Sequence, residues 1–583
     1  MKAERLLALY KKVAESPDAI ARLRRFVLDL AVRGKLVPQD PADEPASELL
    51  KRIAAEKMRQ VKAGEIKVRK QNARERSEPL EFALPKGWAL TELGEVSFKI
   101  TDGAHKTPTY VEKGVPFVSV KDFSGGKLDL TNTRFIPEAE HAALYQRCDP
   151  KRGDILLGRI GTLGRAVLVD IDIEFSLFVS VGLIRFDQRN LSPELFLLLL
   201  NSPFVEQEFD RIKIGGGTHT NKLNLGDLHT VAIPLPPLAE QRRIVAKVEE
   251  LMALLDRLEA ARQQREATRD RLTAASLARL TAHDTDAEAF PTHARFALDA
   301  LPALTARPDQ IKTLRQTILN LAVRGKLAPQ NPTDEPASEL LKRVEKRRKQ
   351  LAAQEGVRRK RPIEPLADRD TLDLPVSWAA DALANLIDPR ATISYGVLVP
   401  GPDVDKGIPF VRAQDLMLTN HPEKPSKTIT PEIESKYART RLNGGEILLC
   451  VVGSIGKLGI APPHWAGANI ARAVARICPV DLIDRDYLLL FLRSDRAQGY
   501  FDEATRTLAQ PTLNVGLIEK LPVPLPPLAE QHRIVAKVDA LMALCDRLEA
   551  SLAQADATRA RLLEALIADA LNPELMQEME AAE

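Results

Sequence analysis

The sequence contains few cysteines and no long apolar run. Its four cysteines, at positions 148, 450, 478 and 545, include no C-x-x-C pair, which argues against a disulfide framework or a thiolate zinc site. The longest apolar stretches, such as residues 195–200, fall far short of the ~20 residues that cross a bilayer. The charged start of the chain lacks the apolar core of a signal peptide. We therefore expect a cytoplasmic protein that binds no metal.

Motifs that carry catalysis are also missing. The sequence has no G-x-x-x-x-G-K-[ST] phosphate loop and no H-E-x-x-H zinc motif. Residues 201–204, Asn-Ser-Pro-Phe, only approach the Asn-Pro-Pro-Tyr motif of methyltransferases, and they follow a Leu-rich run typical of a buried helix. Aromatic residues make up 5% of the chain, whereas RNA-binding proteins commonly stack bases on aromatic side chains. We predict no catalytic residue, and the composition disfavours RNA binding.

Neither sign of charge dominates the chain as a whole. The 583 residues carry 83 Lys and Arg against 80 Asp and Glu, a net charge of +3. Locally, however, residues 51–76 carry net +7 and residues 342–361 carry net +8. Such a run is usually a solvated helix face, but these two recur at the same place in both halves and face no equivalent acidic run. We therefore interpret them as polyanion-binding segments, whose affinity should fall steeply with salt.

The chain is a tandem duplication. Residues 23–52 and 314–343 are identical at 23 of 30 positions, and residues 233–260 and 523–550 at 23 of 28. Two copies with a period of about 290 residues exclude a solenoid, whose repeats are far shorter. Between these blocks the two halves share only brief matches, such as Pro-Phe-Val. This pattern indicates one shared scaffold that carries two different surfaces.

A long helix follows the second repeated block in each half. Apolar residues recur at spacings of four and three from Ile244 to Leu258 and again from Ile534 to Leu552, the seam of a coiled coil. Two such helices can bury their seams on each other; the alternative is two separate amphipathic surface helices. The pairs Glu240-Gln241 and Glu530-Gln531 stand where the helices begin, and we expect them to cap those helices rather than to contact a partner.

The middle of each half has the pattern of a mixed domain. Short β-branched apolar runs at 155–157, 178–186 and 447–452 are separated by Gly, Pro, Asn and Asp, as expected for strands. Leu-rich runs at 195–200 and 487–492 are typical of buried helices. We predict a multidomain α+β fold in which two related α+β domains are separated by long helices that form a coiled-coil spacer, with internal pseudo-two-fold symmetry.

These patterns also give domain boundaries. The expected segments are a helical and basic N-terminal segment (1–83), a first α+β domain (84–236), a central long helix (237–280), a linker with the repeated helical and basic segment (281–373), a second α+β domain (374–526) and a C-terminal long helix (527–583).

Two repeated blocks resemble those of a known family. AVRGKL-x-PQ-x-P-x-DEPASELLKR occurs at 31–52 and 322–343, and PLPPLAEQ followed by a coiled coil occurs at 234–241 and 524–531. Together with the divergent middles, these blocks resemble the DNA-specificity subunit of type I restriction–modification enzymes over nearly the whole chain. The resemblance implies that each middle is a target-recognition domain and that the long helices set the distance between two half-sites of double-stranded DNA.

The resemblance also implies partners and cofactors. Two modification subunits would dock on the repeated regions, joined by a restriction subunit in systems that have one. S-adenosylmethionine, ATP and magnesium would then belong to those partner subunits, and this chain would bind no cofactor. The subunit would supply specificity for DNA methylation and cleavage without performing either reaction.

A glycine-rich stretch is the best candidate for base contacts. Three glycines at 215–217 precede polar residues at 218–222, so that backbone can approach a groove while donors project into it. The counterpart at 505–512 has the same length and different chemistry; the alternative is a glycine-rich turn beside a strand. The base-reading candidates are His219, Thr220, Asn221, Lys222, Arg506 and Gln510, joined by Lys121, Arg412 and Gln414 after the Pro-Phe-Val matches.

Arg165 and Lys457 are candidates for DNA phosphate contacts. Each follows a Gly-x-x-Gly turn, at 161–164 and 453–456, so a positive charge is kept where the neighbouring residues differ. The alternative is a solvated cation at the end of a strand, because Lys and Arg are mostly exposed in proteins.

Two other functions remain open from the sequence. A DNA-acting enzyme with an unrecognised active site would show activity as a purified single subunit. A coiled-coil scaffold or RNA-binding protein would bind folded RNA tightly and show no preference among DNA duplexes.

Overall fold

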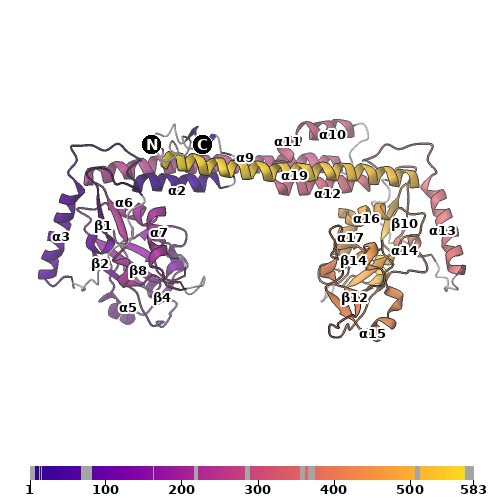
Figure 1. Ribbon diagram of the computed structural model, residues 1–583, viewed down its shortest axis with the longest axis horizontal. Coiled ribbons are helices and arrows are strands. Elements are labelled where there is room, and N and C mark those ends of the chain that lie inside the picture. The colour runs from indigo at the N-terminus through magenta and orange to yellow at the C-terminus, as the bar shows by residue number, and fades with distance from the viewer. Residues whose placement is uncertain are drawn as a thin grey trace. The chain divides into compact units, whose positions relative to one another are not determined.

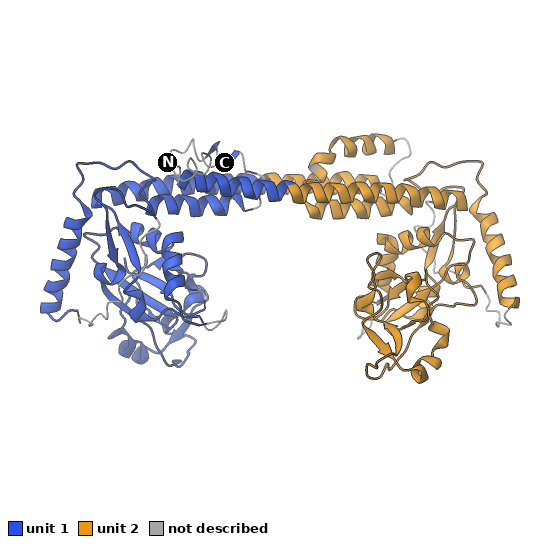
Figure 2. Ribbon diagram, in the orientation of Figure 1, with its two compact units in different colours: residues 1–264, 555–583 blue, residues 265–554 orange. Residues whose placement is uncertain are grey.

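The chain forms two compact units. The computed structural model describes residues 18–66, 82–161, 163–215, 221–281, 289–354, 362–364, 374–505 and 512–571, and single positions between 7 and 16. Unit 1 comprises residues 1–264 and 555–583, and unit 2 comprises residues 265–554 (Figure 2). Both boundaries between the units fall inside long helices, α9 (Leu238–Thr281) and α19 (Leu528–Leu571).

The first repeated block forms two helices in each unit. They are α2 (Ala19–Val32) and α3 (Ala46–Lys62) in unit 1, and α12 (Pro308–Ala322) and α13 (Ala337–Gln354) in unit 2 (Figure 1). The glycine of AVRGKL follows α2 with a φ of +66°, and its equivalent in unit 2 has a φ of +68°. A Cβ on this Gly34 would stand 2.3 Å from Pro85 Cγ. Glycine is therefore required both by the backbone conformation and by the close approach of the following domain.

The middle of each half contains three small sheets with the same topology. In unit 1 the strand orders are β2-β8-β5-β6, β4-β3-β7 and β1-β9, and in unit 2 they are β11-β17-β14-β15, β13-β12-β16 and β10-β18. Only the β3–β7 and β12–β16 pairs are parallel; the other strand pairs named in these sheets are antiparallel. This mixture of sheets and helices in two related units confirms the predicted α+β fold.

The strands of these sheets correspond one to one between the units. The strands of unit 1 are β1 (Ala89–Glu92), β2 (Ser97–Asp102), β3 (Val115–Val118), β4 (Arg134–Ile136), β5 (Ile155–Gly158), β6 (Ala166–Leu168), β7 (Ser176–Leu177), β8 (Val181–Phe186) and β9 (Ala232–Leu235). Those of unit 2 are β10 (Ala379–Ala382), β11 (Ser394–Tyr395), β12 (Ile408–Val411), β13 (Lys427–Ile429), β14 (Ile447–Cys450), β15 (Leu458–Ile460), β16 (Asn469–Ile470), β17 (Val474–Ile477) and β18 (Pro522–Leu525).

Short helices complete each domain. In unit 1 they are α4 (Leu93–Val96), the 3-10 turn η1 (Val120–Phe123), α5 (Glu138–Tyr145), α6 (Pro193–Leu200), α7 (Pro203–Ile212) and α8 (Leu225–Leu228). In unit 2 they are α14 (Leu383–Leu386), η3 (Ala413–Asp415), α15 (Pro431–Ser435), η4 (Ala438–Thr440), η5 (Pro463–Trp465), α16 (Arg485–Arg493), α17 (Asp495–Thr505) and α18 (Val515–Glu519), preceded by α10 (Phe290–Asp299) and α11 (Leu301–Leu304). The Asn-Ser-Pro-Phe near miss starts α7, where Ser202 Oγ accepts the Val205 amide. It is therefore a helix cap.

The central strand of each four-stranded sheet is buried on both faces. Ile155 and Leu157 of β5 join the main apolar cluster of unit 1, whereas Leu156 joins a second cluster on the opposite face. Ile447 and Leu448 of β14 divide in the same way in unit 2. Because both faces are covered, these strands are continuous apolar runs without polar alternation, which is why the sequence indicated them clearly.

The seam of each long helix shares an apolar core with the repeated helices. Ile244 and Leu251 of α9 share a core cluster with Leu23 of α2 and with Leu563 near the end of α19, all within unit 1. In unit 2 the seam of α19 shares its cluster with α12, to which Ile318 contributes. The expectation that the seams bury each other is therefore incomplete, because the apolar faces of α2 and α12 cover much of them. No helix among the described residues is long and apolar enough to cross a membrane.

The Glu-Gln pair of PLPPLAEQ joins the long helix to the α+β domain. Glu240 accepts hydrogen bonds from Trp88 Nε1 at 3.0 Å and Gln39 Nε2 at 2.9 Å. Gln241 Oε1 accepts the Ser192 amide ahead of α6 at 3.1 Å. Gln531 accepts the Asp484 amide in the same way in unit 2. The predicted capping of α9 and α19 is wrong, because the oxygens of these side chains accept hydrogen bonds from other elements and not from the first turn of the helix. The amides of Gln241 and Gln531 also donate to the carbonyls of Pro236 and Pro526, just ahead of the helices.

Candidate nucleic-acid interface

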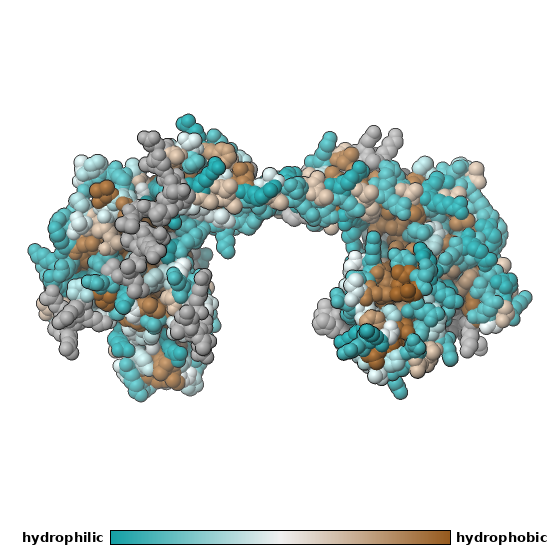
Figure 3. All heavy atoms as spheres, turned by 180° about the vertical axis from the view of Figure 1, so that it is seen from behind, coloured by the Kyte–Doolittle hydropathy of each residue, from teal (hydrophilic) through white to brown (hydrophobic). Residues whose placement is uncertain are grey.

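The structure describes part of the predicted base-reading surface. Asn221 and Lys222 are described, whereas His219 and Thr220 lie outside the described residues. In unit 2 the candidates Arg506 and Gln510 also lie outside them. On the face shown in Figure 3, hydrophilic residues cover most of each unit and apolar residues form small patches.

The described ends of the two candidate stretches lie beside equivalent positions of the four-stranded sheet in each unit. Two backbone hydrogen bonds, of 3.0 and 2.9 Å, join Ile214 and Lys222, which lie on either side of the candidate stretch in unit 1. Lys222 also bridges Ile160, two residues after β5. In unit 2, Thr512 bridges Val452 in the same position. The exposed Lys222 side chain is thus presented beside the β5–β6 turn.

A buried ion pair holds the segment at Leu223 in unit 1. Arg159 donates to Asp102 Oδ2 at 2.7 Å and to the carbonyl of Leu223 at 3.0 Å. Burial lowers the pKa of Arg159, and the nearby Asp102 opposes that shift. His105 and Arg147 contact the other carboxylate oxygen of Asp102, at 3.2 and 3.3 Å. Asp102 therefore holds two arginine side chains and the His105 ring close to Leu223.

Unit 2 holds the equivalent carbonyl by different chemistry. The hydroxyl of Tyr395, at the end of β11, donates to the Leu513 carbonyl at 2.8 Å. Burial raises the pKa of this hydroxyl. Tyr395 pairs with Ala475 of β17 as Asp102 pairs with Gly182 of β8. The sequence analysis missed both tethers. The available signal was a residue followed by glycine at the end of two equivalent strands.

Arg165 and Lys457 follow turns of the same shape. Both glycines of each Gly-x-x-Gly turn have positive φ, between 75° and 84°. The Arg165 side chain is exposed. The Lys457 ammonium donates to the carbonyls of Ala413 and Gln414, at 3.1 and 3.3 Å. Lys457 therefore holds η3, and the assignment of both residues to DNA phosphates stays a prediction.

The remaining candidates lie on η1 and η3. Lys121 donates to the Asn132 carbonyl at 2.8 Å and lies 3.2 Å from Asp122. Arg412 donates to Asp415 at 3.3 Å and also contacts Ser426. Gln414 is exposed. The contacts of Lys457 bring Gln414 and Lys457 together, so unit 2 places two predicted contact residues side by side.

The basic helices are tied to their own domains by a shared cation position. The Lys57 ammonium of α3 donates to the Gly94 carbonyl at 2.6 Å, and Arg348 of α13 donates to the carbonyls of Ala384 and Ile387, both at 2.9 Å. Burial lowers the pKa of both cations. Each therefore satisfies carbonyls of the short helix α4 or α14.

Other cations of these helices are also paired. Three arginines around an open depression of about 410 Å³ contact acidic partners: Arg52 with Glu44, Arg59 with Glu56, and Arg189 with Asp187 and Glu56. In unit 2, Arg347 pairs with Asp481 at 2.6 Å. The described part of each basic run faces single acidic residues on its own helix and on neighbouring turns and loops, which neutralise part of its charge. The positive charges of 67–76 and 358–361 lie outside the described residues.

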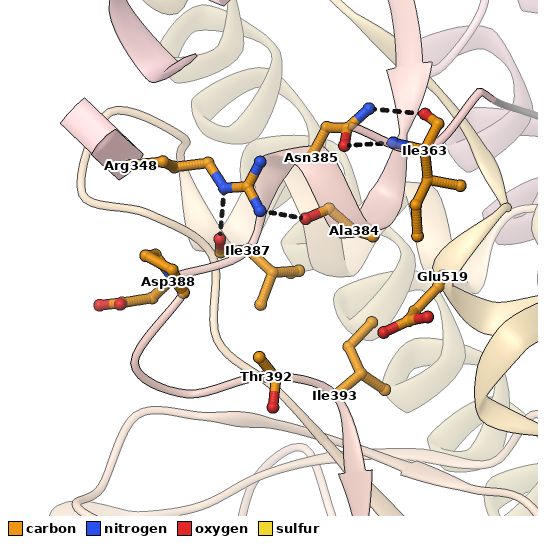
Figure 4. A pocket seen from close by; sticks show the side chains of 10 residues that line it. Arg348, Ile363, Ala384, Asn385, Ile387, Asp388, Thr392, Ile393 and Glu519 are labelled. Carbon is orange, nitrogen blue, oxygen red and sulfur yellow. Dashed lines mark hydrogen bonds between the residues drawn. The ribbon is translucent and has the colours of Figure 1, made fainter. Parts of the chain in front are cut away.

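The site around Arg348 is a packed junction (Figure 4). Asn385 donates to the Ile363 carbonyl at 2.8 Å and accepts the Ile363 amide at 3.1 Å. The cavity beside these residues measures about 30 Å³. That volume accommodates a water molecule and is far too small for a nucleotide.

Replacing Arg348 with methionine is expected to destabilise unit 2 by about 1–3 kcal/mol, because two carbonyls lose a buried charged donor. The matched control is Lys342→Met, whose exposed ammonium pairs with Glu339 one turn away and should matter by less than about 0.5 kcal/mol. Hydrogen exchange at increasing urea follows unit 2 separately from unit 1. Equal effects of the two changes would show that Arg348 is not a tether.

One cluster in unit 1 has the composition of a hydrolase triad. Ser176 Oγ lies 2.9 Å from His141 Nδ1, and His141 Nε2 lies 3.2 Å from Glu174. Ser176 is fully buried, and His141 is 7% exposed. No substrate carbonyl can reach this hydroxyl, so the cluster is a packed hydrogen-bond network. Among the described residues there is also no group of three or more His, Cys, Asp or Glu that could hold a metal ion.

The comparisons with known proteins identify the family. The model of the type I restriction modification DNA specificity domain matches residues 85–267 and 402–555, which together are over half of the chain. The chain therefore belongs to the family of type I restriction–modification specificity subunits, and it is a DNA sequence-specificity subunit.

Two relatives match along almost their whole length. The EcoEI specificity subunit of Escherichia coli is 30% identical over 95% of this chain and 94% of its own, and the EcoAI specificity subunit of the same organism is 28% identical over the same shares. A crystal structure of the HsdS subunit from Thermoanaerobacter tengcongensis is 22% identical over 84% of this chain and 98% of that one, with a TM-score of 0.41.

Proposed function

We propose that each α+β domain of this specificity subunit binds one half of a bipartite DNA target and that the long helices fix the distance between the halves. The observation that carries this proposal is the pair of tethers at one equivalent carbonyl. Arg159 with Asp102 holds Leu223, and Tyr395 holds Leu513. The two domains thus share one scaffold but carry different side chains at the same end of the sheet. Two half-sites of different sequence require such a difference in the side chains that face the DNA.

We further propose that partner subunits perform the chemistry in the cytoplasm. Two modification subunits would bind the repeated helices and transfer the methyl group of S-adenosylmethionine to adenine. A restriction subunit, where the system has one, would use ATP and magnesium to cleave. Asn221, Lys222, Lys121, Arg412 and Gln414 are the described candidates for base contacts. Arg165 and Lys457 are candidates for phosphate contacts, which would make binding strongly salt-dependent.

Exchanging one domain tests this proposal. Residues 84–236 are replaced by the corresponding domain of a relative with another target, and methylated adenines are mapped in cells that also carry the modification subunit. We expect one half of the target to change while the other half and the gap stay, because the second domain and both long helices are untouched. The control exchange of 374–526 should change the opposite half. Altered sequence on both sides, or on neither, would refute the proposal.

A further inference from the structure

A loop follows the same glycine in both domains. Gly103 follows β2 and Gly396 follows β11. A Cβ would stand 1.9 Å from the Leu177 carbonyl at Gly103 and 1.7 Å from the Ile470 carbonyl at Gly396. The next residue is buried in both units, and the two after it are exposed. The backbone therefore presents an exposed pair of side chains at the same place in each unit.

The chemistry of this exposed pair differs between the units. Unit 1 presents His105 and Lys106, whereas unit 2 presents Leu398, 55% exposed, and Val399, 71% exposed. Single exposed apolar side chains are ordinary on protein surfaces. In unit 2, however, two adjacent apolar side chains are exposed where the equivalent side chains of unit 1 are polar. This difference favours a ligand that is apolar at that point.

The pair follows the strand end that contacts the described residues just after the candidate base-reading stretch. In unit 1, Asp102 directly precedes Gly103 and binds Arg159, which holds Leu223. In unit 2, Tyr395 directly precedes Gly396 and holds Leu513. The residue before this loop is thus linked to the segment at Leu223 through Arg159 in unit 1, and directly to Leu513 in unit 2. The loop and that segment therefore lie close together in each unit.

We propose that Leu398 and Val399 contact the C5-methyl group of a thymine in the half-site bound by unit 2; this inference rests on the proposed function. The thymine methyl is the apolar feature of the major groove, and aliphatic side chains recognise it by contact. His105 and Lys106 in unit 1 offer hydrogen-bond donors instead, which suit the acceptors of a purine edge. The same loop would thereby help to give the two half-sites different sequences.

Thymine-to-uracil replacement tests the proposal. The probe is the target duplex, taken from the methylation map, with each thymine of the unit 2 half-site changed in turn to uracil, which lacks only the methyl group. Binding is measured on the complex of this chain with its modification subunits. We expect one replacement to weaken binding about three- to tenfold, as the loss of one buried methyl contact implies. The double variant Leu398→Ala with Val399→Ala should bind thymine and uracil duplexes equally.

Ile173→Ala is the matched control, since Ile173 in unit 1 is also 55% exposed; it should leave the thymine preference intact. If the double variant folds poorly, the conservative variant Val399→Ile is used in its place, and it should retain the preference for thymine over uracil. A unit 2 half-site without a T·A pair, or a double variant that keeps the preference, overturns the inference. A folded double variant that no longer assembles with the modification subunits assigns the pair to a protein contact and also overturns it. If the map of methylated adenines still shows a bipartite target, each of these results overturns only the contact with thymine and not the proposed function.

Discussion

Replacing Asp102 with asparagine is expected to destabilise unit 1 by about 3–5 kcal/mol, the usual cost of leaving a buried charge without its partner. Asp102 is 1% exposed and Arg159 is 7% exposed. The Arg159 guanidinium would keep its charge and its contacts with the Leu223 and Val179 carbonyls, but no carboxylate would neutralise it. Hydrogen exchange should show lost protection in β2, in β8 and around Leu223, and unchanged protection in unit 2.

The matched control is Asp172→Asn. Asp172 pairs with Arg152 at 2.6 Å, and both side chains are more than half exposed, so the change should cost less than about 1 kcal/mol. Tyr395→Phe removes a single neutral hydrogen bond in unit 2 and should cost about 1 kcal/mol there. If Asp102→Asn were no more harmful than these two changes, the ion pair would not organise the end of the sheet.

Inserting four helical residues into both α9 and α19, at the boundaries between the units, is expected to lengthen the gap between the half-sites. Both links between the units run through uninterrupted helix. Four residues add about 6 Å and about 40° beyond a full turn, a length close to two base pairs of DNA. A methylation map in cells carrying the variant with its modification subunit measures the gap directly.

Insertion into α9 alone is the control, because it lengthens only one of the two links. It should reduce methylation without giving a uniformly longer gap. A double insertion that methylates the original site with the original gap would mean that the helices do not set the distance, even if each domain keeps its own half-site.

The parts of the fold that the sequence predicted are those with local periodicity. The strand Ile155–Gly158 is apolar at successive positions because both of its faces are covered, and the seam from Ile244 to Leu258 follows helix periodicity. The role of Glu240 was not predictable in this way. Its partners Trp88 and Gln39 lie about 150 and 200 residues earlier, and the local pattern at a helix start is the same for a cap and for a long-range contact.

The candidate site was predictable only in outline. Comparing the two halves located Asn221 and Lys222, which lie where a loop returns to the sheet. The comparison did not predict the roles of Asp102 and Tyr395. The equivalent carbonyls of Leu223 and Leu513 are held by Arg159 after β5 in unit 1 and by Tyr395 of β11 in unit 2, so the two halves share no residue type that would mark this contact. Lys457 was predicted as a cation, but its contact with the Gln414 carbonyl, 43 residues away, depends on how the β14–β15 hairpin packs on η3.

The burial of Leu563 in the core of unit 1 affects the order in which the protein is completed on the ribosome. Unit 2 is one continuous segment, and all of it has been synthesised when residue 554 is added. Unit 1 still lacks residues 555–571 of α19 at that moment, including Leu563, which shares a core cluster with Leu251 and Leu255 of α9. Unit 1 is therefore the first to be started and the last to receive all of its residues. A ribosome that stalls after residue 554 leaves unit 1 without the last segment of α19, whereas the chain of unit 2 is complete.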